Sequence, residues 1–170
     1  MKKKIVFIMN PKSGSGSKKG IPEAIEKYID AERFDYEIRN TEYAGHACKI
    51  ASEAKDQGVD VVVAVGGDGT VNEVARAIVE SNTALGIIPC GSGNGLARHL
   101  LLPMNIKKCL QVINKCEIHS LDYGRINEHY FFCTCGMGFD AFVSKKFAES
   151  GKRGPITYAE NILREGLTYE

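Results

Sequence analysis

Residues 64–74, AVGGDGTVNEV, place three glycines, an acid and a threonine between a run of valines and a predicted helix. Glycines let consecutive backbone N–H groups point into one concave nest, and such a nest binds anions. A helix that begins directly afterwards adds its own N–H groups and its dipole. Gly66, Gly67 and Gly69 therefore predict a phosphate site. Thr70 either donates its hydroxyl to the phosphate or caps the helix.

Asp68 puts a negative charge in the middle of this predicted phosphate site. A carboxylate beside a polyphosphate is repulsive unless a divalent cation lies between them, or unless it orients other groups toward the phosphate. Phosphoryl transfer uses such a metal to neutralise the charge of the transferred group. The acid favours ATP with Mg²⁺ as the ligand. The alternative is that Asp68 only caps the following helix or closes the turn.

The two commonest phosphate-binding motifs do not occur in the sequence. A Walker A loop needs GxxxxGK[ST], and no glycine is followed by Lys and then Ser or Thr. The dinucleotide fingerprint GxGxxG fails twice. After Gly14 and Gly16, Lys19 holds the position of the third glycine, and the segment GSGNGL ends in Leu96. The predicted phosphate site is therefore of another kind.

Apolar patterns place the glycine-rich turns between strands and helices. Strands are predicted at 4–9, 34–41, 59–65 and 84–90. Helices are predicted at 21–30, 46–58, 71–79 (beginning at Val71) and 106–115, with a further helix after Gly95. This alternation predicts an α/β fold in which helices cover both faces of a parallel sheet. Ligands of such sheets gather beyond the carboxyl ends of the strands, where three glycine-rich turns converge: 10–16, 66–70 and 91–95.

The pattern changes from about residue 118. Residues 118–136 predict two strands joined at Asn127–Glu128, and residues 138–150 and 156–169 predict helices. A single hairpin cannot bury enough surface to stand as a domain. We therefore predict an α/β domain over residues 1–117 and the beginning of a second, β-rich domain over residues 118–170.

Composition excludes several classes of function. The net charge of +1 provides no basic field, so nucleic acid is not predicted as a partner. No window approaches the roughly 20 apolar residues that cross a bilayer, and we expect a cytoplasmic protein. The six cysteines include no CxxC pair, so we expect buried free thiols, with Cys133 and Cys135 on one face of a strand.

Four segments in this order resemble the diacylglycerol kinase catalytic domain family, which includes bacterial lipid kinases and sphingosine kinases. They are NPKSG after the first strand, GGDGT, GSGNGLAR, and LDYG followed by GMGFDA. GGDGT alone is shared with NAD kinases. The resemblance implies a Rossmann-like, three-layer nucleotide-binding domain followed by a β-sandwich domain that continues past Glu170 and supplies the catalytic base.

The resemblance also implies a set of site residues. The predicted nucleotide-binding residues are Asn10, Pro11, Lys12, Ser13, Gly14, Thr41, Gly66, Gly67, Asp68, Gly69, Thr70, Val71, Asn72, Glu73, Gly91, Ser92, Gly93 and Asn94. Asp68 is the predicted catalytic residue of this chain. Asp68 and Asp122 are the predicted metal residues, both acting through water. Asp140 matches a family position whose role the resemblance leaves open.

The implied activity is transfer of the γ-phosphate of ATP, with Mg²⁺, to a hydroxyl of a diacylglycerol-like or sphingoid lipid at a membrane surface. Gly95 stands where bacterial diacylglycerol kinases have an acid, so the acceptor stays open. The segment alone is expected to be inactive because the base lies elsewhere. The alternatives are another GGDG-type kinase, acting on NAD or a sugar phosphate, and a non-catalytic nucleotide-binding module. A homodimer also stays an open alternative.

Overall fold

The computed structural model describes residues 1–11 and 20–149. The chain divides into two compact units, Met1–Phe132 and Cys133–Glu170. In its described residues, 1–11 and 20–132, the first unit contains one parallel sheet, five helices and a short hairpin. Within the described part of the second unit lies the helix α6, Phe139–Glu149, and the predicted helix at 156–169 is outside the described residues. The predicted boundary between residues 117 and 118 stays a prediction.

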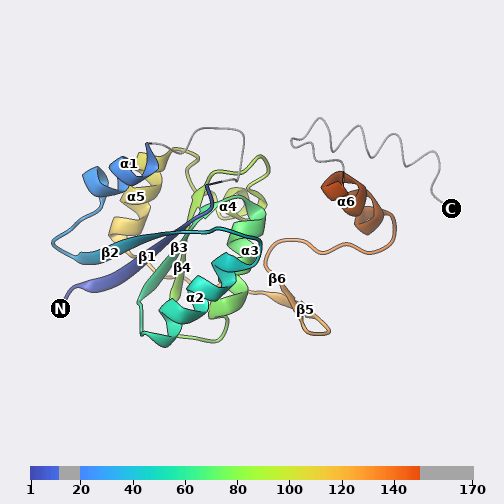
Figure 1. Cartoon of the computed structure of the whole chain (residues 1–170), viewed down its shortest axis with the longest axis horizontal. Helices are drawn as coiled ribbons and strands as arrows, with labels where there is room; N and C mark the ends of the chain where they lie inside the picture. The colour runs from blue at the N-terminus through green and yellow to red at the C-terminus, as the bar shows by residue number, and fades with distance from the viewer. Residues whose placement is uncertain (12–19, 150–170) are drawn as a thin grey trace. The chain divides into compact units, whose positions relative to one another are not determined.

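Strands and helices alternate along the first unit, as the apolar pattern predicts (Figure 1). The strands are β1 Lys3–Met9, β2 Phe34–Asn40, β3 Val61–Gly66, β4 Ala84–Pro89, β5 Gly124–Ile126 and β6 His129–Phe131. The helices are α1 Ile21–Tyr28, α2 His46–Asp56, α3 Asp68–Ile78, α4 Gly95–His99 and α5 Ile106–Lys115.

Four strands pair in parallel in the order β2-β1-β3-β4, which confirms the predicted α/β fold. All six residues of β3 are buried because helices cover both faces of the sheet. The register aligns Met9 of β1 with Val65 of β3, and Gly66 with Pro89 of β4. The loops that follow β1, β3 and β4 therefore leave the sheet at the same edge.

Each face of the sheet has its own apolar core. Val6 and Ile8 of β1 pack with α2, α3 and α4, whereas Ile5 and Phe7 pack with α1 and α5. Figure 1 shows α1 and α5 on one side of the sheet and α2 and α3 on the other. Alternate residues of one strand thus enter opposite cores, which explains why the strand sequence is apolar without interruption.

Two sequence-based expectations are wrong in detail. Helix α3 begins at Asp68 instead of Val71, so the second half of GGDGT already forms the first helical turn. The cysteines were expected to be buried free thiols, but only Cys109 is buried; Cys133 and Cys135 are exposed and lie beyond the end of β6 at Phe131, and the other three are half-buried. The hairpin turn at Asn127 is confirmed, with its φ of 51° typical of a tight hairpin turn.

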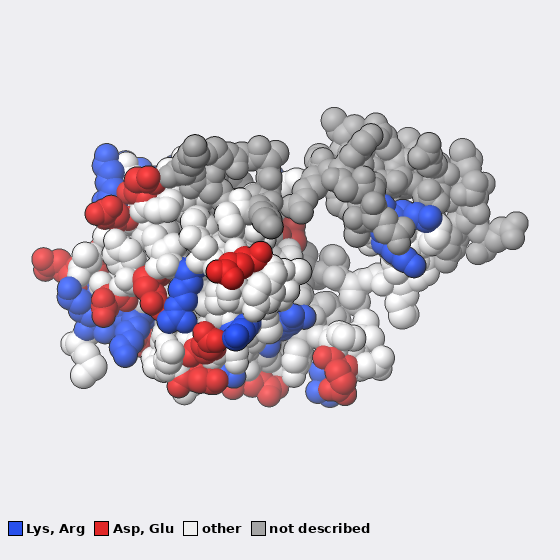
Figure 2. All heavy atoms as spheres, in the orientation of Figure 1, with Lys and Arg blue, Asp and Glu red and all other residues white. Residues whose placement is uncertain are grey.

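The surface of the first unit carries no single-signed field on the face shown in Figure 2, where Lys and Arg side chains lie among Asp and Glu. This mixture agrees with the net charge of +1. Over residues 1–11 and 20–149, no helix has both the length and the apolarity to cross a bilayer.

Candidate functional site

Backbone hydrogen bonds carry the strand pairing one residue into the loops at the carboxyl edge. Asn10 donates its N–H to the carbonyl of Val65 at 3.1 Å, and Cys90 donates to Gly66 at 2.7 Å. Thr41, after β2, donates to the carbonyl of Met9 at 2.9 Å. Four loops therefore start side by side; the sequence predicts this convergence for three of them, and the loop after β2 is the fourth.

The second and third loops touch through their backbones at Gly67 and Gly91. A Cβ built on Gly67 would lie 3.1 Å from the Cα of Gly91, and a Cβ on Gly91 would lie 2.5 Å from the Cα of Gly67. Real Cβ atoms essentially never come as close to a backbone atom as 2.5 Å, and 3.1 Å is tighter than most real contacts. These two glycines are required by the distance between the loops.

The carboxylate of Asp68 joins the same two loops. Oδ2 accepts the backbone N–H of Asn94 at 2.8 Å, and Oδ1 accepts that of Gly95 at 2.6 Å. Gly95 is the first residue of α4, so Asp68 caps a helix other than its own. A Cβ on Gly93 would come within 2.8 Å of Oδ2. Asp68 therefore acts on the protein backbone, and neither alternative weighed from the sequence anticipated these partners.

Asn94 closes the third loop on itself. Its backbone is left-handed, with φ of 56°, and it is 8% exposed. Its side chain accepts the N–H of Gly91 and donates to the carbonyl of Gly91, both at 2.8 Å. The third loop is thus held by the side chain of its own residue Asn94 and by the carboxylate of Asp68, which belongs to α3.

Thr70 links the first loop to the second. Its side chain is buried, and Nδ2 of Asn10 donates to its Oγ1 at 3.4 Å. A Cβ on Gly66 would lie 2.6 Å from the Cβ of Thr70, so glycine is required there. The first N–H groups of α3 have no intrahelical acceptor, and they lie among these loops where an anion can bind.

Glu73 connects α3 to α2. Oε1 accepts the N–H of Gly45 at 3.0 Å, and Oε2 accepts that of Ala47 at 3.2 Å. Both groups belong to the start of α2 at His46. Glu73 thus caps a neighbouring helix as Asp68 does, and its predicted contact with nucleotide stays a prediction.

An aromatic pair in the loop after β2 was not predicted from the sequence. The rings of Tyr43 and His46 stack with centroids 4.4 Å apart and planes 3° apart. Nδ1 of His46 accepts the N–H of Glu42 at 3.2 Å, which fixes the orientation of the ring. Thr41, which precedes Glu42, is 8% exposed. The only signal in the sequence is a Tyr and a His three residues apart around a glycine turn.

The remaining predicted residues fall into three groups. Lys12, Ser13 and Gly14 lie outside the described residues. Val71 is buried in the core between the sheet and α2, whereas Asn72 is half-buried. Pro11 and Ser92 are exposed in the loops, and Gly69 is exposed in the first turn of α3. Of these residues, Val71 packs in the apolar core.

The described residues do not assemble a metal site. Asp122 is exposed ahead of β5, and both oxygens of Asp68 accept backbone N–H groups. In residues 1–11 and 20–149, no three or more His, Cys, Asp and Glu side chains are grouped to hold a metal ion. Asp140 belongs to α6.

Two groups outside the loops have shifted pKa values. Burial, with the neighbouring Cys90 thiol, raises the pKa of Cys109 to about 11, and its thiol donates to the carbonyl of Pro103 at 2.9 Å. The carboxylate of Glu80 accepts the hydroxyl of Tyr123 at 2.6 Å and raises the pKa of that phenol. The hydrogen-bond acceptors of these two groups, Pro103 and Glu80, are not among the predicted site residues, so neither group supports a catalytic role.

A surface hollow of about 340 Å³ lies at the opposite edge, lined by residues 1–3 and 32–34. The pairing of Lys3 with Phe34 places it at the amino ends of β1 and β2. Seven residues of extended strand separate it from the loops, which corresponds to about 20 Å. The hollow is therefore separate from the candidate site.

A family model and curated proteins of similar sequence both point to diacylglycerol kinases. The family model of the diacylglycerol kinase catalytic domain matches residues 4–126. A diacylglycerol kinase from Staphylococcus saprophyticus is 37% identical over 163 residues, which are 93% of this chain and 53% of that protein. One from Staphylococcus aureus strain MRSA252 is 36% identical and covers 93% and 51%.

A solved structure is similar as well. A crystal structure of a diacylglycerol kinase from Bacillus anthracis str. Sterne superposes with a TM-score of 0.65 at 32% identity, covering 76% of this chain and 48% of the other. The chain thus spans about half the length of the proteins it matches.

Proposed function

Because the chain belongs to the diacylglycerol kinase catalytic domain family, we propose that it forms the nucleotide-binding half of an ATP-dependent lipid kinase. The reaction transfers the γ-phosphate of ATP to a hydroxyl of a diacylglycerol-like or sphingoid lipid. The enzyme works on the cytoplasmic side and reaches its substrate at the membrane surface. The acceptor hydroxyl loses its proton to a base that this segment does not provide.

The observation that carries this proposal is the joining of the GGDGT and GSGNG loops at the start of α3. Gly67 and Gly91 bring the two backbones together, and Asp68 fixes the third loop against the second. N–H groups at a helix start, flanked by glycine loops, bind the phosphates of a nucleotide. In a kinase such positioning accounts for a large part of catalysis.

Asp68 is a positioning residue in this proposal. Its two oxygens hold the N–H groups of Asn94 and Gly95, so its negative charge is already engaged at the start of α4. That engagement explains how an acid is accommodated within a phosphate site. Thr70 and Asn10 hold the first loop against the second in the same way.

The family implies Mg²⁺, which supplies charge neutralisation during phosphoryl transfer. The described residues do not fit a protein-ligated metal, because no acidic cluster forms and the oxygens of Asp68 are engaged. We derive no step through the metal. The predicted roles of Asp68 and Asp122, through water, stay predictions.

The test is a substrate panel on the full natural reading frame that encodes this chain. Diacylglycerol, sphingosine, NAD and fructose 6-phosphate are each incubated with γ-labelled ATP. We expect label in one of the two lipids. Label in NAD or in the sugar phosphate instead would show that the protein is another GGDG-type kinase and not a lipid kinase.

Two further measurements address the segment and the non-catalytic alternative. The 170-residue chain is expected to bind a fluorescent ATP analogue weakly and to label no lipid. Lipid phosphorylation by this segment at the rate of the full protein would show that the base lies within it. In the full protein, Asp68→Ala should abolish biological activity, and unchanged activity would favour a nucleotide-binding module without phosphoryl transfer.

A further inference from the structure

An apolar tip follows α4 in the first unit. We use the name Leu100–Met104 tip for residues 100–104, LLLPM. Leu101 is 90% exposed, Met104 42% and Leu100 38%. Single exposed leucines are common on protein surfaces. Three large exposed apolar side chains within five residues form a patch that is typical of an interaction site.

The backbone holds this tip in a defined shape. The N–H of Leu102 bonds to the carbonyl of Ala97 at 2.9 Å, and that of Leu101 bonds to Arg98 at 3.0 Å. These two bonds form a Schellman motif at the end of α4. Leu102 packs against the core, and the thiol of Cys109 donates to the carbonyl of Pro103. The exposed side chains are therefore presented by an anchored turn.

Leu101 occupies the left-handed position of that motif, with φ of 55°. Glycine is the usual residue there, because a side chain is disfavoured in left-handed backbone. A large apolar residue is thus kept where it is both strained and exposed to water. Such an outlier indicates a function for the side chain.

The charge around the tip indicates which partner it meets. Residues 81–116 contain no Asp or Glu, yet they contain Arg98, Lys107, Lys108 and Lys115. Ion pairs in the part of the chain that the structure describes involve only Arg39 and Lys55 among the cations. An apolar tip flanked by cations fits an anionic bilayer, whose surface attracts Lys and Arg.

A second group of exposed apolar residues lacks this pattern. Ile118, Leu121 and Ile126 are 63%, 39% and 40% exposed. Glu117, Asp122 and Glu128 lie among them in the sequence. An anionic surface would repel these acids, so the hairpin region serves as an internal control for the tip.

The tip also lies close to the candidate site. Helix α4 runs from Gly95, which is bonded to Asp68, to His99, immediately before the tip. Five helical residues span about 7.5 Å. A membrane-bound tip would keep the nucleotide loops within reach of lipid head groups.

We propose that the Leu100–Met104 tip, together with Lys108, inserts into the interface of an anionic phospholipid bilayer; Arg98 donates to the carbonyl of Gly93 and Lys107 lies over the ring of Tyr28. The proposal rests on the proposed function, because a lipid acceptor gives the site a reason to lie at a membrane. It concerns binding alone, so it is tested without turnover.

The test is co-sedimentation of the 170-residue chain with vesicles. One set contains phosphatidylglycerol and phosphatidylcholine in equal parts, and the other contains phosphatidylcholine alone. We expect partition onto the anionic vesicles that falls about tenfold in Leu101→Gly, since transferring a leucine side chain contributes about this factor. Glycine suits the left-handed position, so this variant keeps its fold. Lys108→Gln should lower partition about fivefold.

Ile118→Gly is the matched control, because Ile118 is exposed outside any helix or strand, and its partition should equal that of the wild type. Equal partition of Leu101→Gly and the wild type, or an equal loss in Ile118→Gly, would overturn the proposal. So would a dimer in light scattering that Leu101→Gly dissolves, because the tip would then join two copies of the chain. Nucleotide binding is measured on the same samples, so its loss with intact vesicle binding would count against the proposed function alone.

Discussion

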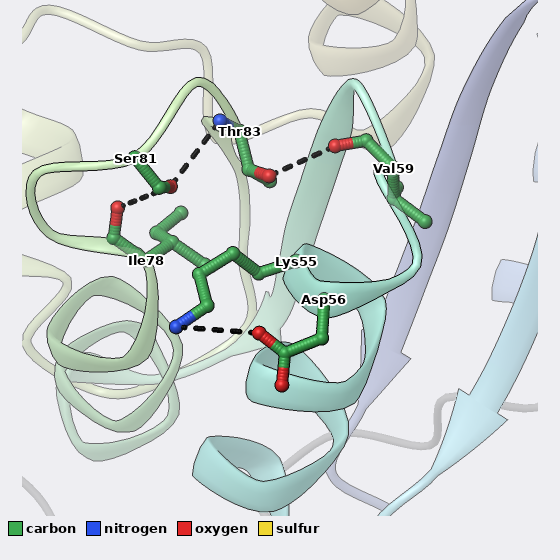
Figure 3. Close-up of polar contacts among 6 residues, drawn as sticks. All are labelled: Lys55, Asp56, Val59, Ile78, Ser81 and Thr83. Carbon is green, nitrogen blue, oxygen red and sulfur yellow. Dashed lines mark hydrogen bonds and ion pairs between the residues drawn. The ribbon is translucent and has the colours of Figure 1, made fainter.

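The two edges of the sheet differ in which backbone groups of their helix ends need hydrogen-bond partners. At the carboxyl edge, the carboxylates of Asp68 and Glu73 each accept two backbone N–H groups from a neighbouring helix start. At the amino edge, hydroxyls donate to backbone carbonyls (Figure 3), and the carboxylate of Asp60 accepts the N–H of Lys4 in β1 at 2.7 Å. Ser81 donates to the carbonyl of Ile78 at 2.7 Å, and Thr83 donates to that of Val59 at 2.9 Å.

Helix polarity explains this difference. In an alternating parallel fold, every helix begins at the carboxyl edge, where its N–H groups need acceptors, and ends at the amino edge, where its carbonyls need donors. Asp68 and Glu73 satisfy the first need, and the hydroxyl of Ser81 satisfies the second at Ile78, the last residue of α3. The ion pair that Figure 3 shows at the amino edge, Lys55 with Asp56, lies between neighbouring residues on the surface and joins no two elements. Two carboxylates at the carboxyl edge thus cap helix starts, so their substitution should differ in kind from removal of a hydroxyl at the amino edge.

The largest effect is expected from Gly91→Ala, because the two loops would have to separate. Its Cβ would lie 2.5 Å from the Cα of Gly67 and 2.9 Å from Oδ1 of Asn94. We expect a loss of about 3 kcal/mol in the free energy of unfolding, measured with urea. Gly69→Ala is the control, since its Cβ would meet nothing within 4 Å. Equal stabilities of the two variants would show that the loops do not touch.

Asp68→Asn separates loop ordering from charge. An amide offers one acceptor, so its NH₂ group would face the N–H of Asn94 or Gly95, and we expect a loss of about 1–2 kcal/mol in stability. If Asp68 only repelled phosphate, Asn would strengthen nucleotide binding. If Asp68 orders the third loop, binding of a fluorescent ATP analogue should weaken about tenfold. Tighter binding would contradict the ordering role.

Strand and loop positions could be predicted because they follow from local pattern. The valine strand and the glycine turns at Gly66 and Gly91 are visible in the sequence, and parallel strands bring such turns to one edge. The partners of Asp68 could not be predicted. They are backbone N–H groups 26 and 27 residues away. Nearly every residue has a backbone N–H group, so the residue types do not indicate which one bonds to Asp68.

The same limit applies to Glu73, which the resemblance assigned to nucleotide, whereas its carboxylate contacts the start of α2. The exposed thiols were missed for another reason. Cys133 and Cys135 extend an apolar run, but β6 ends at Phe131, so the pairing that would bury them stops earlier. The residue types predicted a strand that includes both cysteines, but the strand of the hairpin ends at Phe131.

Glu73→Gln tests the second carboxylate of the carboxyl edge. One of the two N–H groups of Gly45 and Ala47 loses its acceptor, so we expect about 1 kcal/mol less stability and fraying at the start of α2. Cys48 reports this fraying, because it is half-buried in the first turn of α2. Its alkylation rate should rise severalfold. Cys109, with its pKa of about 11, should stay unreactive at neutral pH and serves as the internal reference.

The smallest effect is expected at the amino edge, from Thr83→Val. The substitution keeps the shape of the side chain and removes the hydroxyl that donates to Val59, so stability should fall by about 0.5–1 kcal/mol. Nucleotide affinity should equal that of the wild type, because this hydroxyl carries no charge and lies at the far ends of β3 and β4. Urea unfolding and titration with the ATP analogue measure the two quantities on one sample. A stability loss without a binding loss would separate the two edges by function as well as by chemistry. A binding loss as large as that of Asp68→Asn would mean that the sheet transmits any local loosening to the loops, and the carboxylates would then have no special role.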